Sequence, residues 1–134
     1  KVGANSLTSG DHGTTYGGNP LAAAAINIVL DLFEENHIID NVKVAGSYLE
    51  EKLDGLVSEY DLIETRRGLG LMQGLVLRRP AGDIITKALE KGLVLINAGT
   101  NIIRFVPPLI ITKENIDDMI VILKSCLDEI THQA

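Results

Sequence analysis

Two one-sided helical patterns enclose a stretch of alternating residues, and together they restrict the chain to a layered fold. Residues 39–60 carry apolar side chains on one stripe and charged side chains opposite, the repeat of an amphipathic helix. A second pattern of this kind follows Thr112 and continues to Ile130. Between them, residues 71–77 alternate between two faces, which predicts a strand. Because each helix has one stripe to bury, we expect helices that cover one face of a sheet.

The remaining elements complete an α+β fold. The sequence predicts further helices over residues 20–35 and 83–91, with Gly92 as the residue after the second. Strands are predicted over residues 93–97 and 102–106, with a short one near residues 62–65. The four-residue connection 98–101 predicts a hairpin, so at least one strand pair is antiparallel. We therefore expect a small antiparallel or mixed sheet of three to four strands, covered by helices on one face.

Helix starts are marked by polar caps at two places. Asn19 is a favourable N-cap, and Pro20 fits the first helical position because no hydrogen bond is lost there. Thr112 is the second expected cap, but position 115 is Asn rather than Glu or Gln, which predicts an incomplete capping box. Apolar side chains surround the long first helix, so we expect exposed apolar surface on residues 21–28.

The loop before the first helix is a candidate anion site. It brings the adjacent hydroxyls of Thr14 and Thr15, together with Gly17 and Gly18, to a helix start whose free N–H groups favour negative charge. The alternative interpretation is a structural turn and cap that binds nothing.

Composition narrows the classes of function. A net charge of −6 disfavours binding to nucleic acid or an anionic membrane. The longest apolar run, residues 21–26, is too short to span a bilayer, and no signal peptide is expected. One cysteine fits a reducing compartment, so a cytoplasmic location is expected, and Cys126 is predicted to be a buried, inert thiol. Three scattered histidines give no metal-ligand spacing, so no metal site is expected.

Three segments carry a family resemblance. Residues 12–22 read HGTTYGGNPLA, residues 66–72 read RRGLGLM and residues 101–109 read NIIRFVPPL. In this order they resemble the class III pyridoxal-phosphate aminotransferases, most closely the acetylornithine and ornithine aminotransferase branch. The resemblance implies the C-terminal small domain of a fold type I aminotransferase. It divides the chain into a leader with a cofactor-phosphate loop left from the large domain (1–18), an inter-domain helix (19–36) and the small α+β domain (37–134).

The resemblance also assigns roles to residues. Thr15 matches the position that reaches the cofactor phosphate of the neighbouring subunit, and Thr14 matches an adjacent position that touches substrate. Arg104 matches a residue that binds a substrate carboxylate or a gating glutamate of the missing domain. The Schiff-base lysine lies outside the chain in this family, so no catalytic residue is expected here and the fragment alone is expected to be inactive.

The function implied is transfer of an amino group from N-acetylornithine, or a related ω-amino donor, to 2-oxoglutarate in arginine biosynthesis. Pyridoxal phosphate is the implied cofactor. The implied partners are the missing large domain, a second subunit of a homodimer and small amino and keto acids. Two alternatives stay open: a stand-alone α+β module that binds a small molecule, and an oligomerisation module that uses its exposed apolar helix. Arg104 would then be an ordinary arginine at a strand edge.

Overall fold

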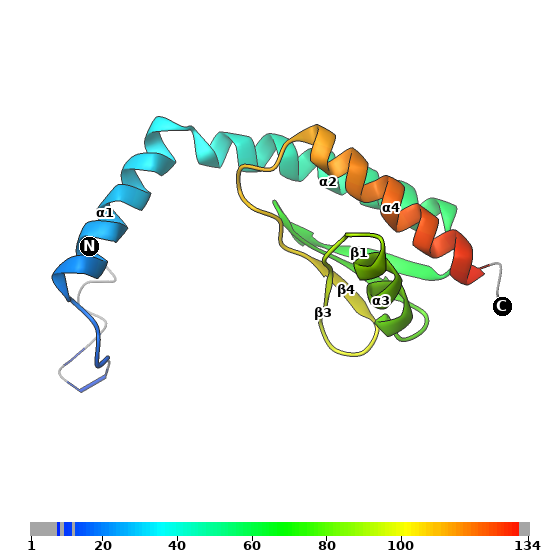
Figure 1. The fold of residues 1–134 in the computed structure, drawn as a ribbon, viewed down its shortest axis with the longest axis horizontal. Coiled ribbons are helices and arrows are strands. Elements are labelled where there is room, and N and C mark those ends of the chain that lie inside the picture. Colours follow the sequence, from blue (N-terminus) through cyan, green and yellow to red (C-terminus); the bar gives the residue numbers. More distant parts are fainter. Residues whose placement is uncertain (1–7, 9, 12, 132–134) are drawn as a thin grey trace. The chain divides into compact units, whose positions relative to one another are not determined.

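The computed structural model describes residues 8, 10, 11 and 13–131, and the N-terminal leader predicted at 1–18 lies partly outside them. The chain divides into two compact units, Lys1–His37 and Ile38–Ala134. Figure 1 shows their elements along the chain. Each unit has its own architecture.

The first unit contains one long helix, α1 (Pro20–Glu35). Asn19 caps it as predicted: its side-chain oxygen accepts a hydrogen bond from the Ala22 N–H at 2.9 Å. No residue of α1 is buried, which confirms the exposed apolar surface expected on residues 21–28. The exposed large apolar side chains are Leu21, Ile26, Ile28, Val29, Leu30 and Leu32.

The second unit is a four-stranded antiparallel sheet with three helices. Its strands are β1 (Ile63–Leu69), β2 (Met72–Leu77), β3 (Ile96–Asn97) and β4 (Ile102–Phe105), in the spatial order β1-β2-β4-β3. Its helices are α2 (Ile38–Glu59), α3 (Gly82–Glu90) and α4 (Lys113–Thr131). The predicted α+β class is therefore confirmed, and both β4 pairs are antiparallel, including the predicted hairpin with β3.

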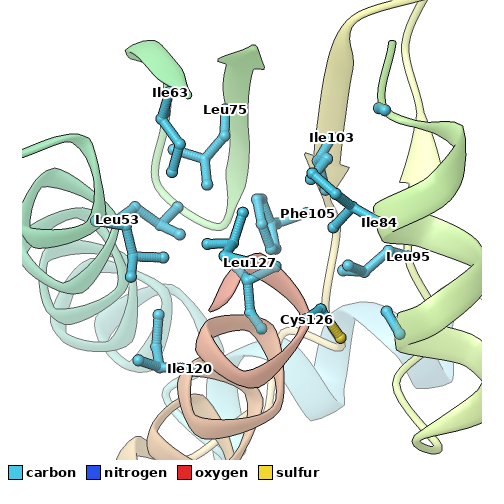
Figure 2. Packing of buried hydrophobic residues seen from close by; sticks show 14 of the residues in the cluster. Leu53, Ile63, Leu75, Ile84, Leu95, Ile103, Phe105, Ile120, Cys126 and Leu127 are labelled. Atoms are coloured by element: carbon cyan, nitrogen blue, oxygen red, sulfur yellow. The ribbon is translucent and has the colours of Figure 1, made fainter. Parts of the chain in front are cut away.

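All three helices share one core with the same face of the sheet. Figure 2 shows Leu53 of α2, Leu75 of β2 and Leu127 of α4 meeting in this core, with Ile84 of α3 against Ile103 of β4. The largest fully buried aliphatic residues come from α2, β2, α3, β4 and α4: Leu49, Leu53, Leu56, Leu75, Leu77, Ile84, Ile103, Ile116, Leu123 and Leu127. Burial of these aliphatic side chains is the main stabilising term of the unit.

The glycine-rich segment 68–71 differs from the prediction. We expected a short strand near residues 62–65 and a separate strand over residues 71–77. Instead β1 continues to Leu69, which pairs with Met72, and Gly70 takes the left-handed conformation (φ 57°) that a tight two-residue turn requires. The register shift lies earlier, between Ile63 and Thr65. Arg66 and Arg67 interrupt the apolar pattern, so the second half of the strand was not predicted.

The capping prediction for α4 was also wrong in one respect. Thr112 caps the helix, with its hydroxyl accepting from the Asn115 N–H at 3.3 Å. The Asn115 side-chain oxygen accepts in return from the Thr112 N–H at 3.3 Å, so the reciprocal box is present. A shorter amide side chain performs the role usually taken by Glu or Gln.

Candidate functional site

The loop 13–19 presents two free hydroxyls. Thr14 and Thr15 are both exposed, and within the described residues neither hydroxyl has a hydrogen-bond partner. Asn19 fixes the loop at its far end, because its amide donates to the Tyr16 carbonyl at 2.7 Å while its oxygen caps α1. The loop is therefore tied to the helix start, and its hydroxyls stay available for a ligand.

The glycines of this loop are required by its geometry. A Cβ atom at Gly17 would lie 2.2 Å from the Cγ2 methyl of Thr14, so a side chain there would displace Thr14. Gly18 takes a positive φ of 72°, which favours glycine. Gly17 thus leaves room for the Thr14 side chain, and Gly18 supplies the positive φ just before Asn19.

Arg104 lies in the second unit, on β4, as the sequence predicted. β4 is an inner strand between β2 and β3, so Arg104 is not a strand-edge arginine. Its neighbours Ile103 and Phe105 are buried on the helix side, whereas Arg104 is exposed on the opposite, open face. No hydrogen bond or ion pair holds its guanidinium within residues 13–131.

A shallow depression of about 500 Å³ surrounds Arg104 on the open face. Arg67, Gly74 and Arg104 contribute to its lining from three neighbouring strands. The other lining residues are Gly68, Leu69, Met72, Gln73, Ala98 and Ile102. Sequence reasoning missed Arg67. The available signal was the Arg66–Arg67 pair, since adjacent residues of a strand point to opposite faces.

Arg66 precedes Arg67 in β1 and lies on the opposite face of the sheet, which the helices cover. It donates to Asp54 at 2.7 Å and to the Gln73 oxygen at 3.0 Å, and it also bonds Glu50. Hydrogen bonding to Asp54, followed by the charges of Asp54 and Glu50, raises the pKa of Arg66. Arg66 therefore fastens α2 to the sheet, a structural role.

A second depression, of about 390 Å³, also borders Arg104. Its lining is apolar apart from Arg104 and Asn115, and it runs along the β3 edge toward α4. Arg104 thus lies between two hollows, one apolar and one with a second arginine.

The lysines of the described residues are all engaged with other groups. Lys43, Lys52, Lys87, Lys91 and Lys124 form ion pairs with carboxylates, and Lys113 lies over the Tyr48 ring. The hydrogen bond to Asp117 raises the pKa of Lys52, and the hydrogen bond to Glu129 raises that of Lys87. A lysine that attacks a carbonyl needs the opposite shift. Lys1 lies outside the described residues.

Other candidate groups are few. Cys126 is buried as predicted, and burial raises the pKa of its thiol, which disfavours the reactive thiolate. Among the described residues, no three His, Cys, Asp or Glu side chains gather closely enough to hold a metal ion. None of the described helices combines the length and apolar character needed to cross a bilayer.

Comparison with known proteins identifies the family of this chain. The family model "Aminotransferase class-III" matches residues 2–127 of the chain. The chain belongs to this family. Acetylornithine aminotransferase of Gloeobacter violaceus is 46% identical over 117 residues, which cover 86% of this chain and 29% of the relative. The enzyme of the same name from Methanocaldococcus jannaschii is 43% identical, covering 95% of this chain and 31% of its own length.

The fold also matches that of a solved aminotransferase. The crystal structure of acetylornithine aminotransferase from Elizabethkingia anophelis matches with a TM-score of 0.83 and 30% identity, covering 92% of this chain and 32% of that one. The chain therefore spans about a third of the length of the relatives it matches. The resemblance stated from the three sequence segments is confirmed. The roles of Thr14, Thr15 and Arg104 stay predictions.

Proposed function

We propose that this chain is the C-terminal part of an aminotransferase that uses pyridoxal phosphate to move an amino group from N-acetylornithine, or a related ω-amino donor, to 2-oxoglutarate. The observation that carries the proposal is Arg104: an exposed guanidinium on an inner strand with no acceptor within the described residues. Arginine offers a planar pair of donors that matches a carboxylate, the group shared by the amino and keto acids of such a reaction.

The loop 13–19 fits the phosphate of the cofactor. Its two free hydroxyls, the close approach allowed by Gly17 and the positive end of α1 are the features that a phosphate site uses. Thr15 would donate to the phosphate and Thr14 would lie beside the substrate. When bound, the cofactor supplies the carbonyl that carries the amino group and the ring that withdraws electrons from it.

This chain then contributes binding and orientation rather than covalent chemistry. Arg104 would hold the substrate carboxylate and so fix which carbon faces the cofactor. The covalent lysine would belong to the rest of the polypeptide, since the lysines described here are engaged elsewhere. We further propose a cytoplasmic homodimer in which Thr15 serves the cofactor of the partner subunit, with arginine biosynthesis as the pathway.

A cofactor-binding measurement tests the phosphate role. In the aminotransferase that carries this chain, Thr15→Ala removes one charge-assisted hydrogen bond, worth about 1.5–3 kcal/mol. The dissociation constant of pyridoxal phosphate, followed by its absorbance, should rise by a factor of roughly 10–100. Thr8→Ala, in the same unit but bonded to Asp11, is the control. An unchanged dissociation constant for Thr15→Ala would remove the role.

The donor is tested by a kinetic comparison. N-acetylornithine, ornithine and 4-aminobutyrate are offered to the same enzyme, and kcat/KM is measured for each with 2-oxoglutarate as acceptor. We expect the highest value for N-acetylornithine and no transamination by the 134-residue chain alone. Transamination by the isolated chain would favour a stand-alone module instead. Equal or lower kcat/KM for N-acetylornithine would reassign the donor.

A further inference from the structure

The sulfur-containing side chains of the chain, two methionines and one cysteine, differ sharply in exposure. Met72, at the start of β2, is 66% exposed. Met119 of α4 is half-buried and packs against the core, and Cys126 of the same helix is fully buried. Because oxidation of sulfur follows its access to solvent, an oxidant in solution reaches the Met72 sulfur far more readily than the other two.

Strand register places Met72 beside the two arginines of the open face. β1 pairs Arg67 with Gly74 of β2, and β2 pairs the same Gly74 with Arg104 of β4. Met72 lies two positions before Gly74 on the same face, so it is the diagonal neighbour of both arginines. Diagonal neighbours in a sheet lie about 7–8 Å apart, which long side chains can span. All three side chains line the same depression.

We propose that Met72 is a site of reversible oxidation by peroxide and that the guanidinium groups of Arg67 and Arg104 hold the oxygen of its sulfoxide. The thioether sulfur attacks one oxygen of hydrogen peroxide, an S–O bond forms and the O–O bond breaks. The proton of the transferred oxygen passes to the departing hydroxide, which leaves as water. The sulfur is oxidised and the peroxide is reduced, so a dithiol used by a methionine sulfoxide reductase can reverse the change.

The surroundings of Met72 suit the oxidised side chain. Oxidation turns an apolar thioether into a strong hydrogen-bond acceptor. Within the described residues, neither Arg67 nor Arg104 donates to an acceptor of the chain, whereas the other three arginines do: Arg66 to Asp54, Arg78 to the Asp61 carbonyl and Arg79 to Asp83. None of the described residues that line the depression is acidic, so no carboxylate of the lining competes with the sulfoxide oxygen. A hydrogen bond from a cationic donor is stronger than one between neutral groups.

The consequence for catalysis rests on the function proposed above. An arginine that donates to the sulfoxide is less available to a substrate carboxylate. Oxidation of Met72 would therefore weaken substrate binding, and its reduction would restore it. Met72 would make the affinity of the enzyme for amino and keto acids respond to peroxide.

Mass spectrometry of the 134-residue chain tests the first step. The chain is treated with hydrogen peroxide, and oxygen uptake is followed separately in the peptides that contain Met72 and Met119. We expect Met72 to be oxidised about tenfold faster than Met119 or more, because its sulfur is exposed. Met72→Leu should abolish the fast uptake, and Met119→Leu should retain it. Equal rates at the two methionines would contradict the proposal.

The arginine Nε–H signals in an NMR spectrum test the second step. In the oxidised wild-type chain the signals of Arg67 and Arg104 should shift, and treatment with methionine sulfoxide reductase should return them. The same signals should stay in place when Met72→Leu is treated with peroxide. Arg79, which pairs with Asp83 outside the depression, is the internal control. If Met72 carries an oxygen and the signals of Arg67 and Arg104 do not move, the arginines do not hold the sulfoxide and the proposal is wrong.

The holoenzyme tests the consequence for substrate binding. Peroxide should raise KM for 2-oxoglutarate about threefold or more in the wild type, and the reductase should reverse the change. Met72→Leu should keep its own KM under the same treatment, which controls for oxidation elsewhere in the polypeptide. Met72→Gln, with a permanent acceptor at this position, should raise KM without peroxide.

Two results with the holoenzyme would overturn the proposal. One is a KM that rises equally in the wild type and in Met72→Leu. The other is a Met72 that takes up oxygen no faster than Met119 in the complete enzyme. If the wild-type enzyme does not transaminate at all, the proposed function fails, whereas mass spectrometry and the arginine signals still decide the oxidation site.

Discussion

Arg66 and Arg67 are adjacent in β1, yet the two faces of the sheet give them opposite surroundings. Arg66 lies on the covered face with its side chain 14% exposed, and its donors meet Glu50, Asp54 and Gln73. Arg67 lies on the open face with no acceptor in residues 13–131. Arg104 shares that face from β4. The covered face satisfies its polar groups internally, whereas the open face keeps its guanidinium groups available.

The same contrast extends to the apolar residues of β2. Leu75 is fully buried against the helices, while Met72 on the other face is 66% exposed. One face of the sheet is buried in the core and stabilises the domain, whereas side chains of the other face are exposed.

The largest effect is expected in the core. Leu75→Ala should lower the free energy of unfolding by about 2–5 kcal/mol, because it removes buried methyl groups and leaves a cavity. Met72→Ala, on the open face of the same strand, should change it by less than about 1 kcal/mol. Urea unfolding followed by circular dichroism measures both. Similar losses for the two variants would mean that the open face is buried in solution.

A smaller effect is expected for the arginine of the covered face. Arg66→Gln should lower the free energy of unfolding by about 1–3 kcal/mol, mainly because the Gln73 oxygen, in a side chain almost fully buried, loses its donor. Glu50 and Asp54 stay half-exposed and solvated, which limits the cost. Arg67→Gln should cost less than about 0.5 kcal/mol in the same urea experiment. A cost for Arg67 as large as for Arg66 would refute the contrast.

The smallest effect concerns pH and the outer surface of the helical layer. Hydrogen bonds from Lys91 and Lys87 lower the pKa of Glu129 to about 2, from an ordinary value of 4.5. A carboxylate whose pKa is lower in the folded state stabilises fully above its unfolded pKa, and the contribution is lost as the pH falls from about 4.5 to 2. Glu129→Gln should therefore flatten the decline in stability over this range.

The control for Glu129 is Glu64→Gln, which removes an exposed carboxylate that forms no ion pair within the described residues. The measurement is the urea midpoint of each protein from pH 7 to pH 2. A wild-type slope retained in Glu129→Gln would show that the two lysines do not hold this carboxylate in solution.

Much of the fold followed from local patterns in the sequence. Local sequence predicted several elements because their signals come from neighbouring residues. These are the Asn19–Pro20 start of α1, the apolar stripes of α2 and α4 and the alternating residues of β2. Only the first part of β1 was predicted, near residues 62–65. Its continuation to Leu69 was missed because Arg66 interrupts the apolar pattern and the contacts that explain it come from Glu50 and Asp54, more than ten positions away.

The candidate site was predictable only in part. Thr14, Thr15 and Arg104 were found through family segments, and Arg104 through its place on a strand. Arg67 was missed because its significance depends on strand register: only the pairing of β1 and β4 with the same Gly74 brings it level with Arg104. Strand register pairs residues that are distant in sequence, so no single segment of the sequence predicts it.

The division between the two faces is tested most directly by measuring one pair of variants in two ways. In the aminotransferase that carries this chain, Arg104→Gln should raise KM for the carboxylate substrate about tenfold or more while the urea midpoint stays as in the wild type. Arg66→Gln should lower the midpoint and leave KM unchanged. If Arg104→Gln instead destabilises the protein and binds substrate normally, the open face is structural and the account is wrong.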